Sequence, residues 1–249
     1  MHPTAIDNCQ HFFNAYGDAL TGPDIKVIEI GAQDVNGSLR TCCPSRFSYC
    51  GVDFVEGKGV DVVLDDPYHL PFETASVDVV LTSSCLEHSE MFWLSFLEAL
   101  RILKPHGLLY INAPSSGDFH RYPVDCWRFY PDAGPALVTW AKRNGMAPLL
   151  LESFTGEQNR YTFNDYVAIF VKDEREAHRY PNRILPGRGD LSNGLLAGST
   201  EFINFQGMSE DVRKLAYIAR IATGNVDLPD DKARLAMITR VIAGQTKVR

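Results

Sequence analysis

The stretch that decides the fold is Val27-Ile28-Glu29-Ile30-Gly31-Ala32-Gln33-Asp34-Val35-Asn36-Gly37. An apolar run over residues 25–30 stops at Gly31, and a polar loop follows that Gly37 closes. Buried strands of parallel sheets have this pattern, and their ligands lie beyond the carboxyl ends of the strands. The two glycines allow backbone conformations that other residues rarely adopt. The stretch therefore predicts the first strand of an open α/β sheet, ending in a ligand-binding turn.

The charges of this turn favour a cationic ligand. A dinucleotide site has the pattern Gly-x-Gly-x-x-Gly, but Gln33 stands at the second glycine position, and Glu29 and Asp34 flank the turn. Two carboxylates would repel a pyrophosphate and attract the sulfonium and ammonium groups of S-adenosylmethionine. A nicotinamide-dependent oxidoreductase is therefore disfavoured. The remaining alternative is an ordinary tight turn without a ligand.

Composition limits the class of protein. With 249 residues, 45% of them hydrophobic and 22% charged, we expect one globular domain with an extension. The net charge of -7 argues against a nucleic-acid partner. Neither an apolar signal core nor a membrane span is recognisable, and the six cysteines lack zinc-type spacing. We expect a cytoplasmic protein whose cysteines are buried free thiols rather than disulfides.

Strand and helix patterns alternate along the first two thirds of the chain. Apolar runs predict strands at 25–30, 47–53, 60–64, 77–82, 108–113, 146–154 and 166–172. Helical spacing of apolar residues predicts helices at 4–20, 91–103 and 135–144. This order predicts an α/β fold: a Rossmann-like, doubly wound, mostly parallel seven-stranded sheet with helices on both faces.

The composition changes after Asp173. Residues 173–208 are rich in Gly, Pro, Asn and Arg, which predicts an irregular excursion, and two amphipathic helices are expected at 209–222 and 230–243. We therefore divide the chain into a domain at 1–173 and a helical C-terminal extension at 174–249. The apolar stripes of the two helices could pack on their own domain, form a homodimer contact, or cap the pocket.

Five short motifs in a fixed order extend the argument. After the first loop come Leu70-Pro71-Phe72, Val77-Asp78-Val79-Val80, Leu86-Glu87-His88 and Leu103-Lys104-Pro105-His106-Gly107. With these motifs, residues 25–172 resemble class I S-adenosylmethionine-dependent methyltransferases, and among them the type 11 group. Gln33 and His106 depart from the glycines of that family. The resemblance implies a methyltransferase that converts S-adenosyl-L-methionine into S-adenosyl-L-homocysteine.

The resemblance also implies where the cofactor lies. Glu29 and Gly31 would form the first cofactor motif, with the backbone at Ala32 and Gln33 facing the methionine part. Asp53 would hold the ribose hydroxyls, although an Asp at a strand end is also a common turn residue. The adenine would be held by Asp66, with Asp65 as the alternative and Pro67 behind the ring. Ser83 and Ser84 would line the methionine end.

The acceptor side is expected in Asp118-Phe119-His120-Arg121-Tyr122-Pro123-Val124-Asp125-Cys126-Trp127-Arg128-Phe129-Tyr130-Pro131. Aromatic rings interleaved with His, Asp and Arg supply stacking faces and a candidate base. The Pro-x-Asp-x-Trp-Arg-Phe pattern is similar to a methyltransferase subgroup associated with glycan assembly, which implies a small-molecule or glycan hydroxyl as acceptor. Its expected contacts are Tyr122, Trp127, Arg128 and Tyr130. Alternatively, Trp127 and Phe129 wedge the loop onto the sheet, and Asp125 and Arg128 form a structural ion pair.

Methyl transfer is an in-line displacement, so it requires positioning but neither a metal nor a covalent intermediate. A hydroxyl acceptor needs a base. We predict His120 as that base, Asp125 as the group that orients it, and His88 as a positioning residue that could replace it. The alternative to an active enzyme is a cofactor-binding, catalytically silent partner subunit that docks through the C-terminal helices.

Overall fold

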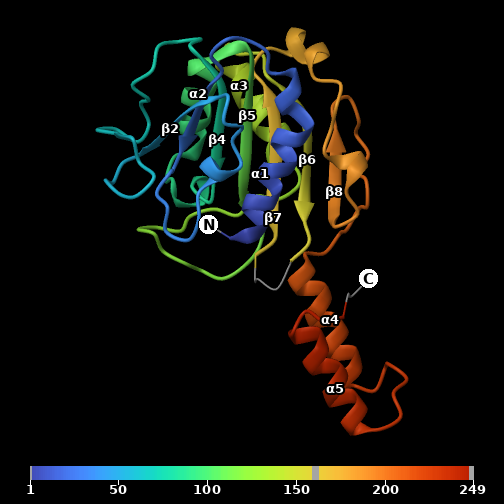
Figure 1. The fold of residues 1–249 in the computed structure, drawn as a ribbon. Helices are drawn as coiled ribbons and strands as arrows, with labels where there is room; N and C mark the ends of the chain where they lie inside the picture. The colour runs from blue at the N-terminus through green and yellow to red at the C-terminus, as the bar shows by residue number, and fades with distance from the viewer. Residues whose placement is uncertain (1, 159–162, 247–249) are drawn as a thin grey trace.

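A single eight-stranded sheet forms the centre of the molecule, in the order β3-β2-β1-β4-β5-β7-β6-β8 (Figure 1). The computed structural model describes residues 2–158 and 163–246. The strands are β1 (Lys26–Ile30), β2 (Ser48–Asp53), β3 (Val62–Val63), β4 (Val77–Ser83), β5 (Leu103–Pro114), β6 (Leu149–Gly156), β7 (Asp165–Val171) and β8 (Leu191–Leu196). The first five are parallel, and β7, β6 and β8 each run antiparallel to their neighbour. The predicted α/β sheet is confirmed.

One correction concerns the number of strands. The seven predicted strands are all present, but β8 adds an eighth at the edge of the sheet, beside β6. It lies within residues 173–208, so the interpretation of that whole segment as irregular is wrong. Its central Ser192-Asn193-Gly194 breaks the apolar run that would have revealed a strand. A Cβ at Gly194 would lie 2.6 Å from the end of the Leu185 side chain, which would have to move to make room for it.

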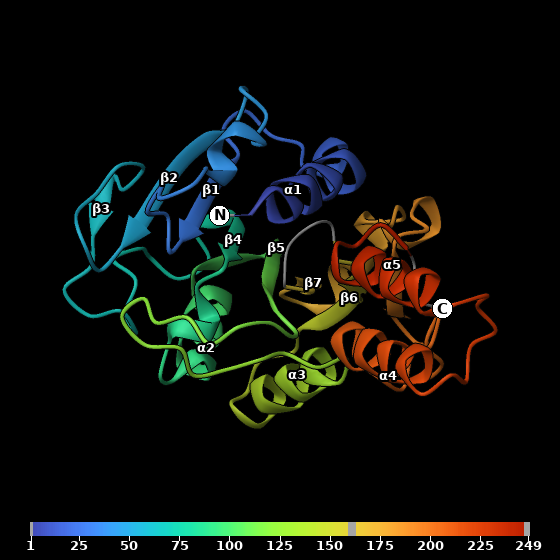
Figure 2. The ribbon, with the colours of Figure 1, turned by 90° about the horizontal axis from the view of Figure 1, so that it is seen from below.

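Helices cover both faces of the sheet, as predicted (Figure 2). On one face lies α1 (Pro3–Tyr16), and on the other lie α2 (Phe92–Ile102) and α3 (Ala133–Arg143). Phe12 and Tyr16 of α1 pack with the alternate strand residues that face them, whereas Phe96 of α2 packs on the opposite side. The two hydrophobic cores are therefore separated by the sheet, whose central strands are buried on both faces.

The connections between the first four strands contain no α-helix in this fully described part of the chain. Only a 3-10 turn at Leu39–Thr41 lies between β1 and β2. The loops that follow β1, β2, β4 and β5 open at the carboxyl edge of the parallel strands. The start of β7 lies at the same edge, because Asp165 pairs with Pro114.

Two C-terminal helices project from this edge as a hairpin (Figure 1). They are α4 (Glu210–Ala222) and α5 (Asp231–Ile242), and they pack on each other with Ile221 and Val241 buried. The alternative in which both stripes pack on their own domain is therefore wrong. Glu210 fixes the start of α4, because its Oε2 accepts from the backbone N of Gln158 at 2.8 Å. None of the helices in the described residues is both long and apolar enough to cross a bilayer.

Candidate active site

The turn after β1 depends on the glycine at position 31. Gly31 has φ of +79°, and its backbone N donates to the carbonyl of Val52 at 2.9 Å. A Cβ there would lie 2.6 Å from the Cβ of Cys85, which begins the turn after β4. The loops after β1 and β4 are therefore in close contact, and only glycine provides both the conformation and the space.

Glu29 lies beneath this turn, and only 1% of its surface is exposed. The hydroxyl of Tyr49 donates to its Oε2, and its Oε1 has no hydrogen-bond partner in the described structure. Burial raises the pKa of Glu29 to about 7, against the lowering effects of Tyr49 and Arg40. An uncompensated buried carboxylate oxygen at the carboxyl end of β1 is suited to a cationic ligand.

The raised pKa of Glu29 predicts a pH effect on stability. Between pH 4.5 and about 7 the folded chain keeps a proton that the unfolded chain has lost, so the stability falls as the pH rises through this window. Relative to the Glu29→Gln variant, the wild-type free energy of unfolding should fall by roughly 3 kcal/mol across the window. Urea unfolding at a series of pH values measures this difference. The exposed Glu56→Gln variant should follow the wild type; a Glu29→Gln profile parallel to the wild type would contradict the prediction.

Asp53 is the last residue of β2 and lies beside the first turn. Its Oδ2 accepts from the backbone N of Gln33 at 3.4 Å, and the hydroxyl of Tyr122 donates to the Gln33 Oε1 at 2.8 Å. The structure thus brings together the predicted ribose ligand, the predicted methionine loop and one predicted acceptor residue. Tyr122 reaches this turn from the loop after β5, so that loop lies across the first turn.

The residues predicted to contact the adenine are exposed to solvent, whereas one of those predicted to contact the methionine part is buried. Asp65, Asp66 and Pro67 are exposed, and the Oδ1 of Asp66 accepts from the backbone N of Tyr68 at 2.8 Å. At the end of β4, Ser83 is buried, and its Oγ has no hydrogen-bond partner within the described residues. Ser84 has φ of +49°, which turns the chain away from the strand. All of these residues lie at the carboxyl edge, and their cofactor roles stay predictions.

The loop after β5 is built around a buried carboxylate. Asp125 accepts two hydrogen bonds from Arg128, at 2.5 and 2.8 Å, and a third from the backbone N of His120 at 2.7 Å. The bonds from Arg128 lower the pKa of Asp125 to about 2. The Nδ1 of His120 lies 3.4 Å from the same carboxylate and 3.1 Å from the carbonyl of Asp118. Asp125 therefore fixes both the backbone and the ring of His120.

The other acceptor residues divide into two groups. Trp127 donates through its Nε1 to the carbonyl of Ser89 at 2.9 Å and packs on Phe92, and Phe129 is buried. These contacts correspond to the wedge alternative. Tyr122 and Tyr130 are 55% and 65% exposed and remain accessible to a ligand. The ion pair of Asp125 with Arg128 is also present, but it supports His120 as well.

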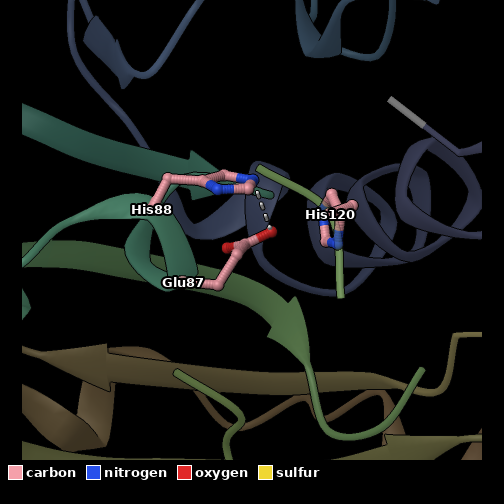
Figure 3. A group of neighbouring side chains, drawn as sticks. All are labelled: Glu87, His88 and His120. Carbon is pink, nitrogen blue, oxygen red and sulfur yellow. Dashed lines mark ion pairs between the residues drawn. The ribbon is translucent and has the colours of Figure 1, made fainter. Parts of the chain in front are cut away.

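His88, His120 and Glu87 form one cluster (Figure 3). One nitrogen or oxygen atom from each residue lies within 4.8 Å of the other two. The two imidazole rings meet edge to face, with 4.9 Å between their centroids. Glu87 and His88 belong to a 3-10 turn after β4, whereas His120 comes from the loop after β5. Burial raises the pKa of Glu87 to about 8 and lowers that of His88. The structure thus joins two of the three predicted catalytic residues with a carboxylate that was not predicted.

Several functional candidates were missed from the sequence. Glu87 was visible as a carboxylate beside His88, in the turn that follows β4. A buried hydrogen-bond chain runs from Asn8 to Asn112 at 3.0 Å and from Asn112 to Asp165 at 3.2 Å. Its members come from α1, β5 and β7, and nothing in the local pattern connects them. The ring of Phe163 lies edge to face against the ring of His120, with 5.0 Å between their centroids.

Two surface hollows lie outside this cluster. One, of about 460 Å³, opens beside Asp34, Arg40 and Lys58 on the outer side of the first turn. The other, of about 310 Å³, is an apolar groove between α2 and α3. Neither is lined by Asp53 or Asp66.

Comparison with known proteins identifies the domain. Residues 32–111 match the family model described as a methyltransferase domain. This match begins in the turn after β1 and ends within β5. This matched part of the chain is similar to a methyltransferase domain. The type 11 resemblance is confirmed at this level, and so is S-adenosylmethionine as the cofactor of the family.

Two similar proteins show how much of the chain the similarity covers. The phthiotriol/phenolphthiotriol dimycocerosates methyltransferase 1 of Mycobacterium ulcerans (strain Agy99) is 34% identical over 96 residues, which cover 37% of this chain and 31% of the relative. The crystal structure of the Burkholderia thailandensis 1,6-didemethyltoxoflavin-N1-methyltransferase has a TM-score of 0.51 and 16% identity, and covers 68% of this chain and 79% of that one. The chain thus spans less than a third of the length of its curated relative, and the structural likeness concerns the fold.

The residues of the domain fit this cofactor. At the carboxyl ends of β1 and β4, Glu29 Oε1 and Ser83 Oγ are buried without hydrogen-bond partners in the described structure. Such atoms are costly unless a ligand completes them. Asp53 at the end of β2 has the position of a ribose ligand in a doubly wound sheet. When bound, the cofactor supplies the methyl group as a sulfonium.

Proposed function

We propose that this chain is a methyltransferase that transfers the methyl group of S-adenosylmethionine to a hydroxyl of a small molecule or glycan. The observation that carries the proposal is the position of His120. Its ring lies against Asp125, at 3.4 Å, and against His88, at the edge where Asp53 and the first turn meet. A hydroxyl must lose a proton during methylation, and this pair of imidazoles is placed to receive it.

The protein contributes position and proton transfer. The turn between Gly31 and Gln33 would hold the methionine part, and Asp53 the ribose. The acceptor hydroxyl would lie between the exposed tyrosines of the loop after β5 and the imidazole of His120. Its oxygen bonds to the methyl carbon as the carbon–sulfur bond breaks, the sulfur keeps the electron pair, and His120 takes the proton. The products are a methyl ether and S-adenosylhomocysteine.

The proposed acceptor class is inferred from the residues of this chain and not from the acceptors of its relatives. The names of the two relatives refer to phthiotriol dimycocerosates and to a toxoflavin nitrogen, which are different acceptors. Folds of this kind host many acceptors. A glycan hydroxyl is favoured by the Pro123-x-Asp125-x-Trp127-Arg128-Phe129 pattern, and the two exposed tyrosines offer faces on which a sugar ring can stack.

The direct test is to incubate the full chain with methyl-labelled S-adenosylmethionine and an extract of its source, and then to identify the labelled compound. We expect the label in a small molecule or glycan, as an ether that survives alkali. A label in a protein, a nucleic acid or an amine would overturn the hydroxyl acceptor. NADH titrated in parallel should show no binding.

Asp53 tests the cofactor site separately. Replacing it with Ala removes the acceptor of two ribose hydroxyls, and a hydrogen bond to a charged group is worth about 1.5–3 kcal/mol. We therefore expect the Kd for S-adenosylmethionine to rise about 10–100-fold, measured by calorimetry. Asp18→Ala is a matched control, because this side chain is fully exposed. An unchanged Kd would remove Asp53 from the site.

The helical hairpin supports a second proposal, a homodimer. Leu215, Leu235 and Ile242 are 67%, 66% and 71% exposed on helices that project from the body of the fold. Such exposed apolar residues mark association surfaces when they are contiguous. The same surface could instead dock a silent subunit onto an active enzyme, the alternative function.

A cytoplasmic location belongs to the proposal as well, since all six cysteines are free, as in a reducing compartment.

A double change, Leu215→Glu with Leu235→Glu, tests the association. We expect a dimer for the wild type and a monomer for the variant in light scattering, because a charge in an apolar contact is costly. The far-UV circular dichroism spectrum should be unchanged, since both side chains are exposed in the single folded chain. A control with Lys232→Glu, at an exposed polar position of α5, should remain dimeric. A monomeric wild type would contradict the homodimer.

A further inference from the structure

The cluster of Glu87, His88 and His120 has the composition of a metal site. Two imidazoles and one carboxylate form the protein ligands of catalytic zinc sites and of the facial triads that bind other divalent metals. Their ligand atoms lie within 4.8 Å of one another. A tetrahedral ion about 2.1 Å from each would hold its ligand atoms about 3.4 Å apart, so the most widely separated of them would move closer by roughly 1 Å or more on binding. The side chains point toward one another in Figure 3.

A second observation points to a ligand. Glu87 is 1% exposed, and its Oε2 has no hydrogen-bond partner in the described residues, while its Oε1 lies 3.7 Å from the Nε2 of His88. That distance is too long for a hydrogen bond. Buried carboxylate oxygens are nearly always hydrogen-bonded or bound to a metal. Arg128, whose charge lowers the pKa of Glu87, already donates to Asp125.

The outer contacts of both imidazoles also fit a metal site. The Nδ1 of His88 lies 2.5 Å from the carbonyl of Val124, and the Nδ1 of His120 lies 3.1 Å from the carbonyl of Asp118. A carbonyl only accepts, so Nδ1 is the donor in each contact, and this tautomer leaves Nε2 free to offer its lone pair to an ion. Metal-binding histidines show this arrangement, in which the second nitrogen donates to a carbonyl or a carboxylate.

We propose that Glu87, His88 and His120 bind one divalent transition-metal ion, through one carboxylate oxygen and two Nε2 atoms. Three protein ligands leave a coordination position open for a substrate oxygen. The neighbouring turns fix the ligands: the backbone carbonyl of Glu87 accepts from Cys126 at 2.7 Å, which ties the turn after β4 to the loop that carries His120. The site therefore assembles only when these two loops are in contact.

The position of the ion suggests its role, which rests on the proposed function. Bound to the ion, the acceptor hydroxyl has a lowered pKa and releases its proton to solvent water. The resulting alkoxide oxygen bonds to the methyl carbon, the carbon–sulfur bond breaks, and the sulfur keeps the electron pair. The ion keeps its oxidation state. In this form of the reaction, His120 is a ligand rather than the proton acceptor.

Binding is tested with Co²⁺ alone, on the full chain freed of metals with a chelator. We expect one ion per chain, with visible ligand-field absorption. Glu87→Gln and His120→Asn should each weaken binding by more than about 100-fold, because losing even an outer partner, as in Asp125→Asn, costs about 10–100-fold. The matched control is His178→Asn, an exposed histidine on another segment. His120 lies on a loop and is 37% exposed, so its variant tests the site if Glu87→Gln fails to fold.

Two results would overturn the site: no saturable Co²⁺ binding by the folded wild type, or binding that survives in a folded Glu87→Gln or His120→Asn variant. The role of the ion is tested separately, by comparing turnover of chelated and reloaded protein at equal occupancy of S-adenosylmethionine. Undiminished turnover without metal would overturn the role. Metal binding without any labelled acceptor supports the site and counts against the proposed function alone.

Discussion

The His120→Gln variant is expected to lose turnover by about 10²–10⁴-fold, the contribution of a positioned proton acceptor, while its Kd for S-adenosylmethionine stays nearly constant. The reason is geometric. His120 lies in the loop after β5, where it is held by Asp125 and contacts His88. The residues expected to hold the cofactor lie elsewhere, in the turn after β1 and at Asp53, the end of β2. Gln keeps the size of the side chain and removes a group that can accept a proton at neutral pH.

Turnover with the labelled acceptor and calorimetry with the cofactor measure these two quantities. His178→Gln is the matched control, because this histidine is exposed and lies on the segment after β7. Turnover that is unchanged in His120→Gln would remove the residue from the site. A parallel Co²⁺ titration then separates the two roles of His120: lost turnover with intact metal binding favours the base, and loss of both favours the ligand.

The Glu152→Ala variant is expected to be the most destabilised single substitution outside the site. Glu152 in β6 is 0% exposed and accepts three hydrogen bonds: from Tyr16 at 2.6 Å, and from the backbone N of Ile184 and Leu185 at 2.7 and 3.0 Å. Removing the carboxylate leaves three buried donors unpaired, each at a cost of about 1–3 kcal/mol. We therefore expect the free energy of unfolding to fall by at least about 3 kcal/mol, a large part of the usual total.

Urea unfolding measures this loss as a lower midpoint with an unchanged slope. Tyr16→Phe removes only one donor and leaves both amides paired, so its effect should be clearly smaller. Glu56→Ala, at an exposed position, should unfold like the wild type. If Glu152→Ala were no less stable than Tyr16→Phe, the carboxylate would not hold these elements together.

The carboxyl-edge turn could be predicted because its signals are local. The apolar run before Gly31, the glycine itself and the polar residues that follow lie within the thirteen positions 25–37, and the strand period is visible over a few residues. The same holds for the ends of α4 and α5, where the side chains of Ser209 and Asp230 accept from backbone N groups three residues later. Local hydrogen bonding and apolar periodicity determine these features without the rest of the chain.

The strand β8 and the position of the hairpin could not be predicted in this way. The apolar pattern of β8 is interrupted by Asn193 and Gly194, and it becomes a strand because β6 offers an unpaired edge. The stripes on α4 and α5 predicted that they would pack, but not that they would pack on each other and leave Leu215 and Leu235 exposed. Which surface covers an amphipathic helix is decided by the other elements available to it.

The sequence by itself determined the alternation of strands and helices, the turn after β1, the class of cofactor and the loop that carries His120. Only the tertiary structure decided that Glu87 faces this histidine and that Glu152 joins β6 to α1. The reason is physical: a turn or a strand is specified by neighbours in the chain, whereas these contacts join residues separated by 33 positions in one case and 136 in the other. Their meeting depends on how the sheet orders its strands and how the loops at its edge close on one another.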